Sequence, residues 1–233
     1  MARLTDRRRP FSLPEAWFYD VAVADGSFAA VRPLVDDIAG SLAPEGRLLD
    51  AGCGGGHEAV ALAQARADVH VVGVDPSAAA LRRAIRRTDR TPANSMTLAR
   101  GSALTLPFPS GVFTAAVSFF SIKHWPDPRA GVAELVRVTR PGGRLLVVEV
   151  DGRATAAEWR RYVDLTRVPR ALRGLFARIT HATVVRPSLG PSALEAAFRD
   201  LPVDGLHIDV VDNVPCLVAR AHKASVHEIA PRQ

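Results

Sequence analysis

The sequence predicts an α/β protein with a Rossmann-like, doubly wound, mainly parallel seven-stranded sheet, an antiparallel C-terminal edge hairpin and a helical cap. Three observations support this fold. Short, nearly continuous apolar runs alternate with helical patterns, as is typical of a parallel sheet covered on both faces. A turn with four glycines in five positions joins the first run to a helix. Two apolar runs close together near the C-terminus predict the hairpin.

Composition narrows the class of protein. The 233 residues are 48% hydrophobic and 23% charged, which is typical of one domain, or one domain with a cap. No apolar stretch has the length of a membrane span or forms a signal-peptide core. Two cysteines, Cys53 and Cys216, are too few for a disulfide framework, so we expect a cytoplasmic protein.

The net charge of +6 comes almost entirely from arginine. Such a surplus suits an anionic substrate, an acidic partner, an anionic membrane surface or nucleic acid. Solvated helix faces explain it more simply. We therefore do not expect a nucleic-acid partner.

The N-terminal residues 1–45 predict a basic tail, over residues 1–10, and a helical cap. The cap begins at residues 16–20 and continues over residues 28–42, where Val31, Leu34, Val35 and Ile38 have helical spacing.

Residues 46–150 predict an α/β core. Its strands are expected over residues 47–50, 69–74, 95–100, 113–120 and 144–150. Its helices are expected over residues 57–67, 78–87 and 129–138, and residues 140–143 (R-P-G-G) are expected to stop the last one.

Beyond Asp151 the alternation ends. Residues 151–204 predict a helical lid or substrate-binding insertion, with one helix over residues 155–179 and another over residues 191–199. The first helix has an apolar stripe that we expect to be buried: Leu172, Leu175, Phe176 and Ile179. Residues 205–233 predict the last two strands, over residues 206–211 and 217–221, and a C-terminal tail.

The glycine turn spells D-x-G-x-G-x-G, from Asp50 through Gly52 and Gly54 to Gly56. Glycine tolerates positive φ and lets a ligand approach the backbone. The following helix N-terminus offers free N–H groups. A dinucleotide site requires G-x-G-x-x-G, but His57 stands at the third glycine, and no Gly-Lys-Ser/Thr marks a phosphate loop.

Polar or aromatic residues follow four of the predicted strands. They are Asp50, Asp75, Ser102 and the segment 119–121 (F-F-S). Ligands of open α/β sheets bind beyond the carboxyl ends of strands, where a carboxylate such as Asp75 can accept both ribose hydroxyls. The alternative role for Asp75 is to cap the helix that follows.

Further motifs extend this pattern over the middle hundred residues. They are G-S-A-L-T-L-P-F-P at 101–109, S-F-F-S-I-K-H-W-P-D-P at 118–128 and R-V-T-R-P-G-G-R-L at 137–145. With the glycine turn, residues 48–150 resemble the class I S-adenosylmethionine (SAM) dependent methyltransferases of the ubiquinone/menaquinone-biosynthesis type. The rest of the chain resembles no family that we recognise.

The resemblance implies SAM as cofactor, S-adenosylhomocysteine (SAH) as product, and a set of binding residues. The methionine part would lie on Asp50 and the turn residues Gly52, Cys53, Gly54 and Gly56, with Phe119 nearby. Asp75, beside Pro76, would hold the ribose, and Ser102 and Ala103 would face the adenine. Trp17 and Tyr19 would close over the cofactor, unless they pack in the core. Two departures are Ser102 and Thr114, where the family usually has acids.

Methyl transfer depends mainly on alignment of the acceptor with the methyl group. A hydroxyl acceptor benefits from a base, and the resemblance makes His124 the candidate, oriented by Glu149 or Asp151. The alternative is that His124 only shapes the turn before Trp125.

Several other activities lack their residues. Residues 118–121 lack the proline pair of DNA amino-methyltransferases, neither cysteine suits pyrimidine C5 methylation, and no Cys/His cluster predicts a metal. We expect a methyltransferase for a small-molecule or lipid-like acceptor. A non-catalytic SAM-binding regulatory protein and an NAD-type dehydrogenase are the alternatives, and the acceptor, the methylated atom and the oligomeric state stay open.

Overall fold

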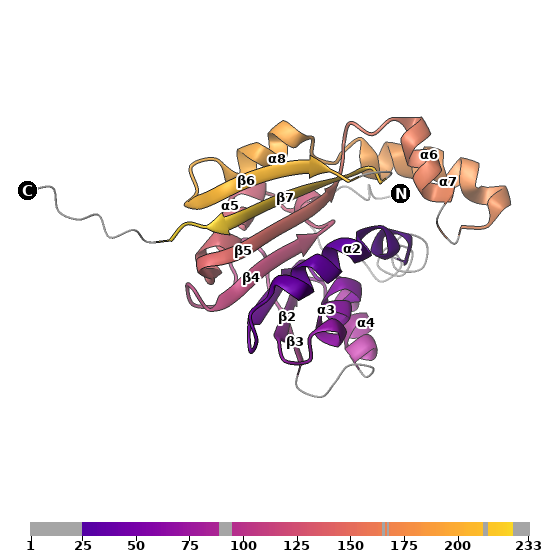
Figure 1. Cartoon of the computed structure of the whole chain (residues 1–233). Coiled ribbons are helices and arrows are strands. Elements are labelled where there is room, and N and C mark those ends of the chain that lie inside the picture. Colours follow the sequence, from indigo (N-terminus) through magenta and orange to yellow (C-terminus); the bar gives the residue numbers. More distant parts are fainter. Residues whose placement is uncertain (1–24, 89–94, 165, 167, 212–213, 226–233) are drawn as a thin grey trace, which may run out of the picture.

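The computed structural model describes residues 25–88, 95–164, 166, 168–211 and 214–225. One seven-stranded sheet runs through these residues in the order β3-β2-β1-β4-β5-β7-β6 (Figure 1). Its strands are β1 (Arg47–Ala51), β2 (His70–Asp75), β3 (Met96–Arg100), β4 (Phe113–Phe119), β5 (Thr139–Val150), β6 (Val203–Val210) and β7 (Cys216–Lys223). The first five pair in parallel, and β7 is antiparallel to both β5 and β6. The predicted fold class and its edge hairpin are confirmed.

Helices cover both faces of the sheet. The α-helices are α2 (Asp25–Ser41), α3 (His57–Ala65), α4 (Ala78–Thr88), α5 (Pro128–Val138), α6 (Ala156–Asp164), α7 (Arg173–Thr180) and α8 (Pro191–Phe198). Short turns of other helix types are η2 (Ile122–His124), η3 (Arg170–Leu172) and the π-helical η4 (His181–Val185). One core joins the sheet to α2, α3, α6 and α7, and the other joins it to α5 and α8.

Strand β1 shows why the central strands are apolar throughout. Leu48 packs into the first core and Leu49 into the second, and both are fully buried. Successive strand residues point to opposite faces, so a strand covered on both sides has no solvent-facing position. The strand order reverses between β1 and β4, which places the ligand-binding crevice of this fold at the carboxyl ends of these two strands.

Helix α5 ends at Val138, as predicted, but residues 140–143, expected to form the stop between this helix and the next strand, belong to strand β5. The strand begins at Thr139, directly after α5, and its pairing with β4 shifts register between Phe113 and Ala115. Gly142 lies within this irregular part with φ +70°. An irregular part of β5 therefore contains the residues that resemble a turn in the sequence.

The single helix predicted over residues 155–179 is also wrong. Helix α6 ends at Asp164, and the Thr166 hydroxyl donates to the Val163 carbonyl oxygen at 2.7 Å. Pro169 then precedes η3, from which α7 continues. Proline has no N–H for a helical hydrogen bond, and it disfavours helical φ/ψ in the residue before it.

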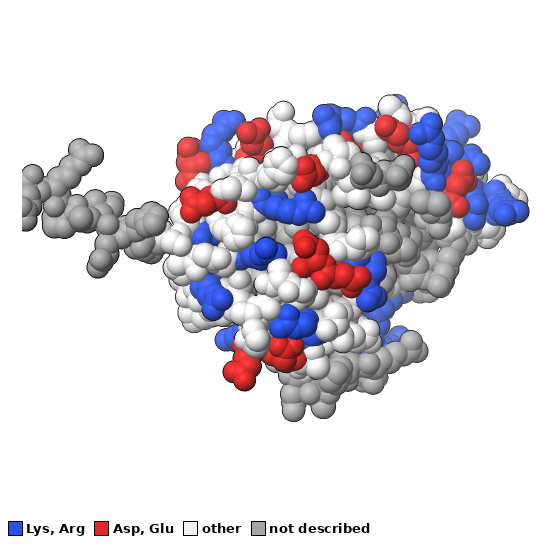
Figure 2. Space-filling view, viewed as in Figure 1, with Lys and Arg blue, Asp and Glu red and all other residues white. Residues whose placement is uncertain are grey.

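The apolar stripe predicted to be buried lies mostly on the surface. Leu172, Leu175 and Ile179 are exposed, and Phe176 is partly buried. The buried positions of α6 and α7 are instead Trp159, Tyr162, Val163, Ala177 and Thr180. Figure 2 shows many lysine and arginine side chains at this end of the molecule. Among the helices of the described ranges, none has the length and apolar character of a membrane span.

Candidate cofactor-binding and active site

The glycine turn between β1 and α3 is held against strand β2. Gly52, Gly54 and Gly56 have φ of +79°, +51° and +78°, in the left-handed region that favours glycine. The Gly52 and Cys53 N–H groups donate to the Val74 carbonyl oxygen at 2.7 and 3.0 Å. These hydrogen bonds to β2 hold the turn in place at the carboxyl end of β1, where the strand order reverses.

The three glycines differ in what surrounds them. A Cβ at Gly52 would collide with the Ser121 hydroxyl, and a Cβ at Gly56 would lie 2.9 Å from the Ala84 Cβ. A Cβ at Gly54 would meet no atom within 4 Å. Gly52 thus lets the segment after β4 pack on the turn, Gly56 lets α4 approach, and Gly54 faces open space at the site.

Asp75, at the end of β2, binds the glycine turn directly. Its two carboxylate oxygens accept hydrogen bonds from the Gly54 N–H at 3.0 Å and the Ser77 N–H at 2.8 Å. The cap of α4 is supplied by Ser77, whose hydroxyl oxygen accepts from the Ala80 N–H at 3.3 Å. Burial raises the pKa of Asp75, and the two backbone donors oppose that shift.

Asp50, at the end of β1, is a buried carboxylate with no hydrogen-bond partner among the described residues. The residue is 1% exposed, and both carboxylate oxygens lack a donor. Burial, with smaller contributions from Glu58 and Asp75, raises its pKa well above the ordinary value. Desolvating a carboxylate without a partner is costly, so this position suits a ligand that brings positive charge or hydrogen-bond donors.

The side chains of Cys53 and Phe119 are buried. A Cβ at Gly73 would lie 2.9 Å from the Cys53 sulfur, so this thiol packs against β2. Burial raises the pKa of Cys53 well above its ordinary range, which makes the thiol a poor nucleophile. Of the predicted cofactor residues, Cys53 therefore contributes its backbone to the turn.

Ser102 and Ala103 follow β3, which pairs with β2 on the side away from β1. The Ser102 hydroxyl oxygen accepts from the Leu104 N–H at 3.1 Å, and Ala103 is buried. Pro76 is exposed, and its carbonyl oxygen accepts from the Arg100 side chain at 3.1 Å. Part of the Ser102 hydroxyl's accepting capacity is thus used within its own turn.

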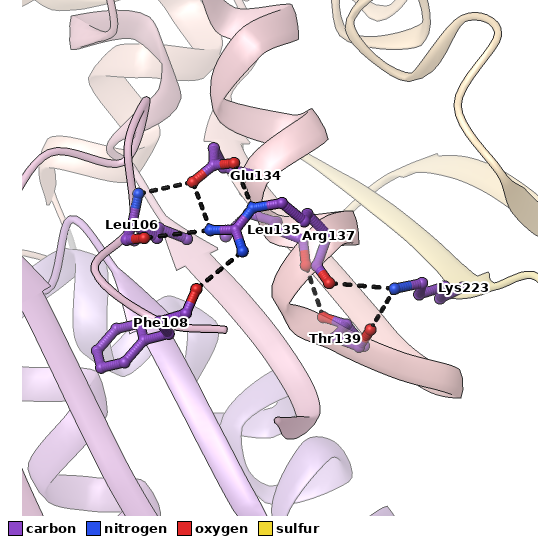
Figure 3. Close-up of polar contacts among 7 residues, drawn as sticks. All are labelled: Leu106, Phe108, Glu134, Leu135, Arg137, Thr139 and Lys223. Atoms are coloured by element: carbon purple, nitrogen blue, oxygen red, sulfur yellow. Dashed lines mark hydrogen bonds and ion pairs between the residues drawn. The ribbon is translucent and has the colours of Figure 1, made fainter. Parts of the chain in front are cut away.

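Two of the sequence motifs meet in one polar network behind this loop (Figure 3). Arg137 donates to the carbonyl oxygens of Phe108 and Leu106 at 2.8 and 3.1 Å, and to both carboxylate oxygens of Glu134. Glu134 also accepts from the Leu106 N–H at 2.7 Å. Arg137, the first arginine of the R-V-T-R-P-G-G motif, therefore holds the L-P-F loop that follows Ser102 and Ala103.

His124 is the last residue of η2, beyond strand β4. The backbone N–H of His124 donates to the Ser121 carbonyl oxygen at 2.9 Å, and the residue is partly buried. The Ser121 hydroxyl accepts from the Trp125 indole N–H at 2.9 Å where it packs on Gly52. The segment that carries His124 thus contacts the glycine turn.

A buried ion pair beside His124 is not predicted from the sequence. The Lys123 ammonium donates to Glu149 Oε1 at 2.7 Å and to the Phe120 carbonyl oxygen at 3.2 Å. Phe120 is strained, with φ +52°. The sequence does contain a signal for this pair. Lys123 follows β4 and Glu149 stands near the end of β5, and the carboxyl ends of neighbouring parallel strands meet at one edge of the sheet.

The carboxylates expected to orient His124 have other partners. Glu149 binds Lys123 and accepts from its own neighbour's N–H, that of Val150, at 2.7 Å. Asp151 binds the Arg153 side chain at 2.9 Å. Trp17 and Tyr19 lie outside the described residues. Within the described ranges, no group of His, Cys, Asp and Glu has an arrangement that could hold a metal ion.

Residues 49–147 match the Methyltransf_11 family, described as a methyltransferase domain. The chain is 31% identical over 201 residues to a 37.1 kDa protein in transposon Tn4556 of Streptomyces fradiae, covering 85% of this chain and 56% of that protein. It is 39% identical over 122 residues to a ubiquinone/menaquinone biosynthesis C-methyltransferase of Syntrophotalea carbinolica, covering 52% of this chain and 48% of that enzyme. The chain thus spans about half the length of these two curated relatives.

The fold is also similar to that of solved methyltransferases. One is geranyl diphosphate C-methyltransferase from Streptomyces coelicolor, in complex with Mg²⁺, geranyl diphosphate and SAH. The TM-score is 0.62 at 18% identity, covering 84% of this chain and 79% of that one. The family match over residues 49–147 and the glycine turn between β1 and α3 show that this part of the chain is a class I SAM-dependent methyltransferase domain.

Proposed function

We propose that this protein transfers a methyl group from SAM to a small-molecule or lipid-like acceptor. The observation that carries the proposal is the buried Asp50 carboxylate, which has no donor among the described residues and lies beside a glycine turn that is open at Gly54. SAM has an α-ammonium group, which would supply the positive charge and N–H donors that Asp50 lacks. The residues present therefore fit the cofactor.

The other strand ends would hold the rest of the cofactor. Asp75 has lone pairs left after its two backbone hydrogen bonds and would accept from the ribose hydroxyls. Ser102 and Ala103 would line the adenine site. The Ser102 hydroxyl can accept one further, neutral hydrogen bond, so it would hold an adenine amine less tightly than a carboxylate would.

When bound, SAM supplies an electrophilic methyl group on a sulfonium. The protein's main contribution would be to align the acceptor with this group, since proximity supplies much of the rate. His124 is the proposed base for a hydroxyl acceptor, and its place on the segment packed against Gly52 supports this role. The Lys123–Glu149 pair would hold that segment in place.

The acceptor class is proposed from the relatives. The names of two of them give ubiquinone/menaquinone biosynthesis and geranyl diphosphate, which favours small molecules with a long apolar part. Residues 151–204 are the proposed acceptor-binding lid, because they follow β5 and their helices α6 and α7 lie at the carboxyl end of the sheet, whereas α8 packs on a face of the sheet beside α5 (Figure 1).

Calorimetry with SAH and with NAD tests the cofactor, and a turnover assay with SAM and candidate acceptors tests catalysis. SAH should bind and NAD should not. NAD binding would return the protein to the dehydrogenase class, and SAH binding without turnover of any acceptor would favour a regulatory protein.

His124→Ala tests the base. We expect kcat to fall by about 10²–10⁴ and the pH profile to lose one limb, while SAH affinity holds. His70→Ala, a change in a histidine that contacts Thr97 between β2 and β3, is the matched control. A fall in kcat below tenfold for His124→Ala would leave alignment alone as the mechanism.

A further inference from the structure

We propose that the outer face of η3 and α7 docks on an anionic lipid bilayer. We call this surface the α7 face. Its apolar members are Leu172, Leu175 and Ile179, which are 55%, 60% and 51% exposed. They are spaced three and four residues apart, so they lie along one side of the helix. Arg170 and Arg178, both exposed, are its basic members.

Contacts on the opposite side hold the α7 face outward. The Trp159 indole N–H donates to the Thr180 hydroxyl oxygen at 2.7 Å, and both residues are buried. The Arg173 side chain donates to the carbonyl oxygens of Val168 and Thr166 at 2.8 and 3.2 Å. Rotating α7 to bury Leu175 and Ile179 would break these hydrogen bonds inside the protein, so the exposure follows from the packing.

The charges around the α7 face select the occupant. Arg170, Arg178 and Arg186 are exposed and make no ion pair with any other described residue. Arg160 and Arg173 share one acid, Asp164, at 3.4 and 3.9 Å. Leucine and isoleucine beside exposed arginines are typical of helices that lie in the interface of an anionic membrane.

Two other occupants fit the charge less well. A second copy of the chain would bring arginines against arginines, which repel. Residues 1–24 carry four arginines and three acids, so they offer no net negative charge. An anionic bilayer matches both parts of the α7 face, because its headgroups carry negative charge for the arginines and its interior is apolar, as are the leucines and the isoleucine.

The α7 face lies at the end of the molecule toward which the arrowheads of β4 and β5 point (Figure 1). A docked bilayer would therefore lie near the edge of the sheet where the acceptor is proposed to react. That link to a lipid-like acceptor rests on the proposed function, whereas the docking itself does not.

Sedimentation of the full chain with lipid vesicles tests the proposal. We expect binding to phosphatidylcholine vesicles that contain phosphatidylglycerol, weak binding to phosphatidylcholine alone, and a loss of binding with rising salt. The double change Leu175→Ser and Ile179→Ser should weaken binding by roughly tenfold or more. The double change Arg170→Gln and Arg178→Gln should weaken it on the order of tenfold, on the anionic vesicles only.

The matched control is Ile85→Ser on α4. Ile85 is 53% exposed and lies between Ala84 and Arg86, among arginines, but has no exposed leucine beside it. This change should leave vesicle binding unaltered, and thermal unfolding should confirm that each variant folds.

Three results would overturn the docking proposal. They are no binding of the unaltered chain to anionic vesicles, an equal loss of binding for Ile85→Ser, and a change of oligomeric state in light scattering for the Leu175→Ser and Ile179→Ser variant. The last would make the α7 face a protein interface. SAH calorimetry on the same samples keeps the two proposals apart, because retained SAH binding without vesicle binding overturns the docking alone.

Discussion

Two buried carboxylates stand at the carboxyl edge of the same sheet with opposite surroundings. Glu149, at the end of β5, is fully buried, and its oxygens accept from the Lys123 ammonium and from the N–H groups of Lys123 and Val150. Asp50, at the end of β1, is buried almost as deeply and has no donor among the described residues. Asp75 lies between these extremes, with two backbone donors.

The different surroundings of Glu149 and Asp50 point to different roles, one in stability and the other in ligand binding. A buried charge is tolerated when it is paired and hydrogen-bonded, as Glu149 is. Removing such a charge destabilises the protein, because its partner is then left buried without a counter-charge. A buried charge without partners reduces stability, so it persists where a ligand completes it. The β4–β5 end of the site is therefore complete within the protein, and the β1–β2 end is the part that the proposed cofactor would complete.

The largest effect is expected at Glu149. Glu149→Gln keeps the shape but leaves the Lys123 ammonium buried without its counter-charge, so the free energy of unfolding should fall by about 3–5 kcal/mol. Denaturant unfolding measures this change. Asp36→Asn, in the exposed Arg32–Asp36 pair, is the control and should change unfolding little.

A second variant keeps this prediction decisive. Replacing both partners, by Lys123→Met with Glu149→Leu, should recover much of the loss, because no charge is then left buried alone. Unfolding of Glu149→Gln at the wild-type denaturant midpoint would show that the pair does not stabilise this edge of the sheet.

An intermediate effect is expected at Asp75, now on ligand binding. Asp75→Ala removes a charged acceptor from the proposed ribose site, so SAH affinity should fall by about 1.5–3 kcal/mol. Calorimetry measures it, with Asp37→Ala on the exposed side of α2 as the control. Unchanged affinity in a folded Asp75→Ala protein would contradict the ribose assignment.

The smallest effect, and one of opposite sign, is expected at Asp50. Because burial raises the pKa of Asp50 above its ordinary value of 3.8, the folded state holds this proton more tightly than the unfolded state. The unaltered protein therefore loses stability as the pH rises from about 4 toward the pKa of the folded state. Asp50→Asn lacks this loss and should be more stable by about 1 kcal/mol at pH 7 without ligand.

Thermal unfolding at pH 4 and pH 7 checks the sign. The gain of Asp50→Asn should be near zero at the lower pH and grow toward the higher one, while SAH affinity should fall. A variant less stable than the unaltered protein at both values would mean that Asp50 has a structural role like that of Glu149.

The sequence by itself predicts the strands, the edge hairpin and the placement of Asp50 and Asp75 at strand ends. These features depend on local properties: the period of apolar residues and the need for glycine where φ is positive. The turn that contains Gly52, Gly54 and Gly56 is therefore readable from the chain.

Tertiary packing decides the rest. The partner of Glu149 lies 26 residues away along the chain, and the helix-stop pattern at Gly142 lies within β5 because Thr139 and Arg144, on either side of it, both pair with β4. Along η3 and α7 the apolar stripe of Leu172, Leu175 and Ile179 competes with a smaller one of Ala177 and Thr180. The smaller stripe is buried because Trp159 on α6 binds Thr180, a contact that no periodicity within α7 contains.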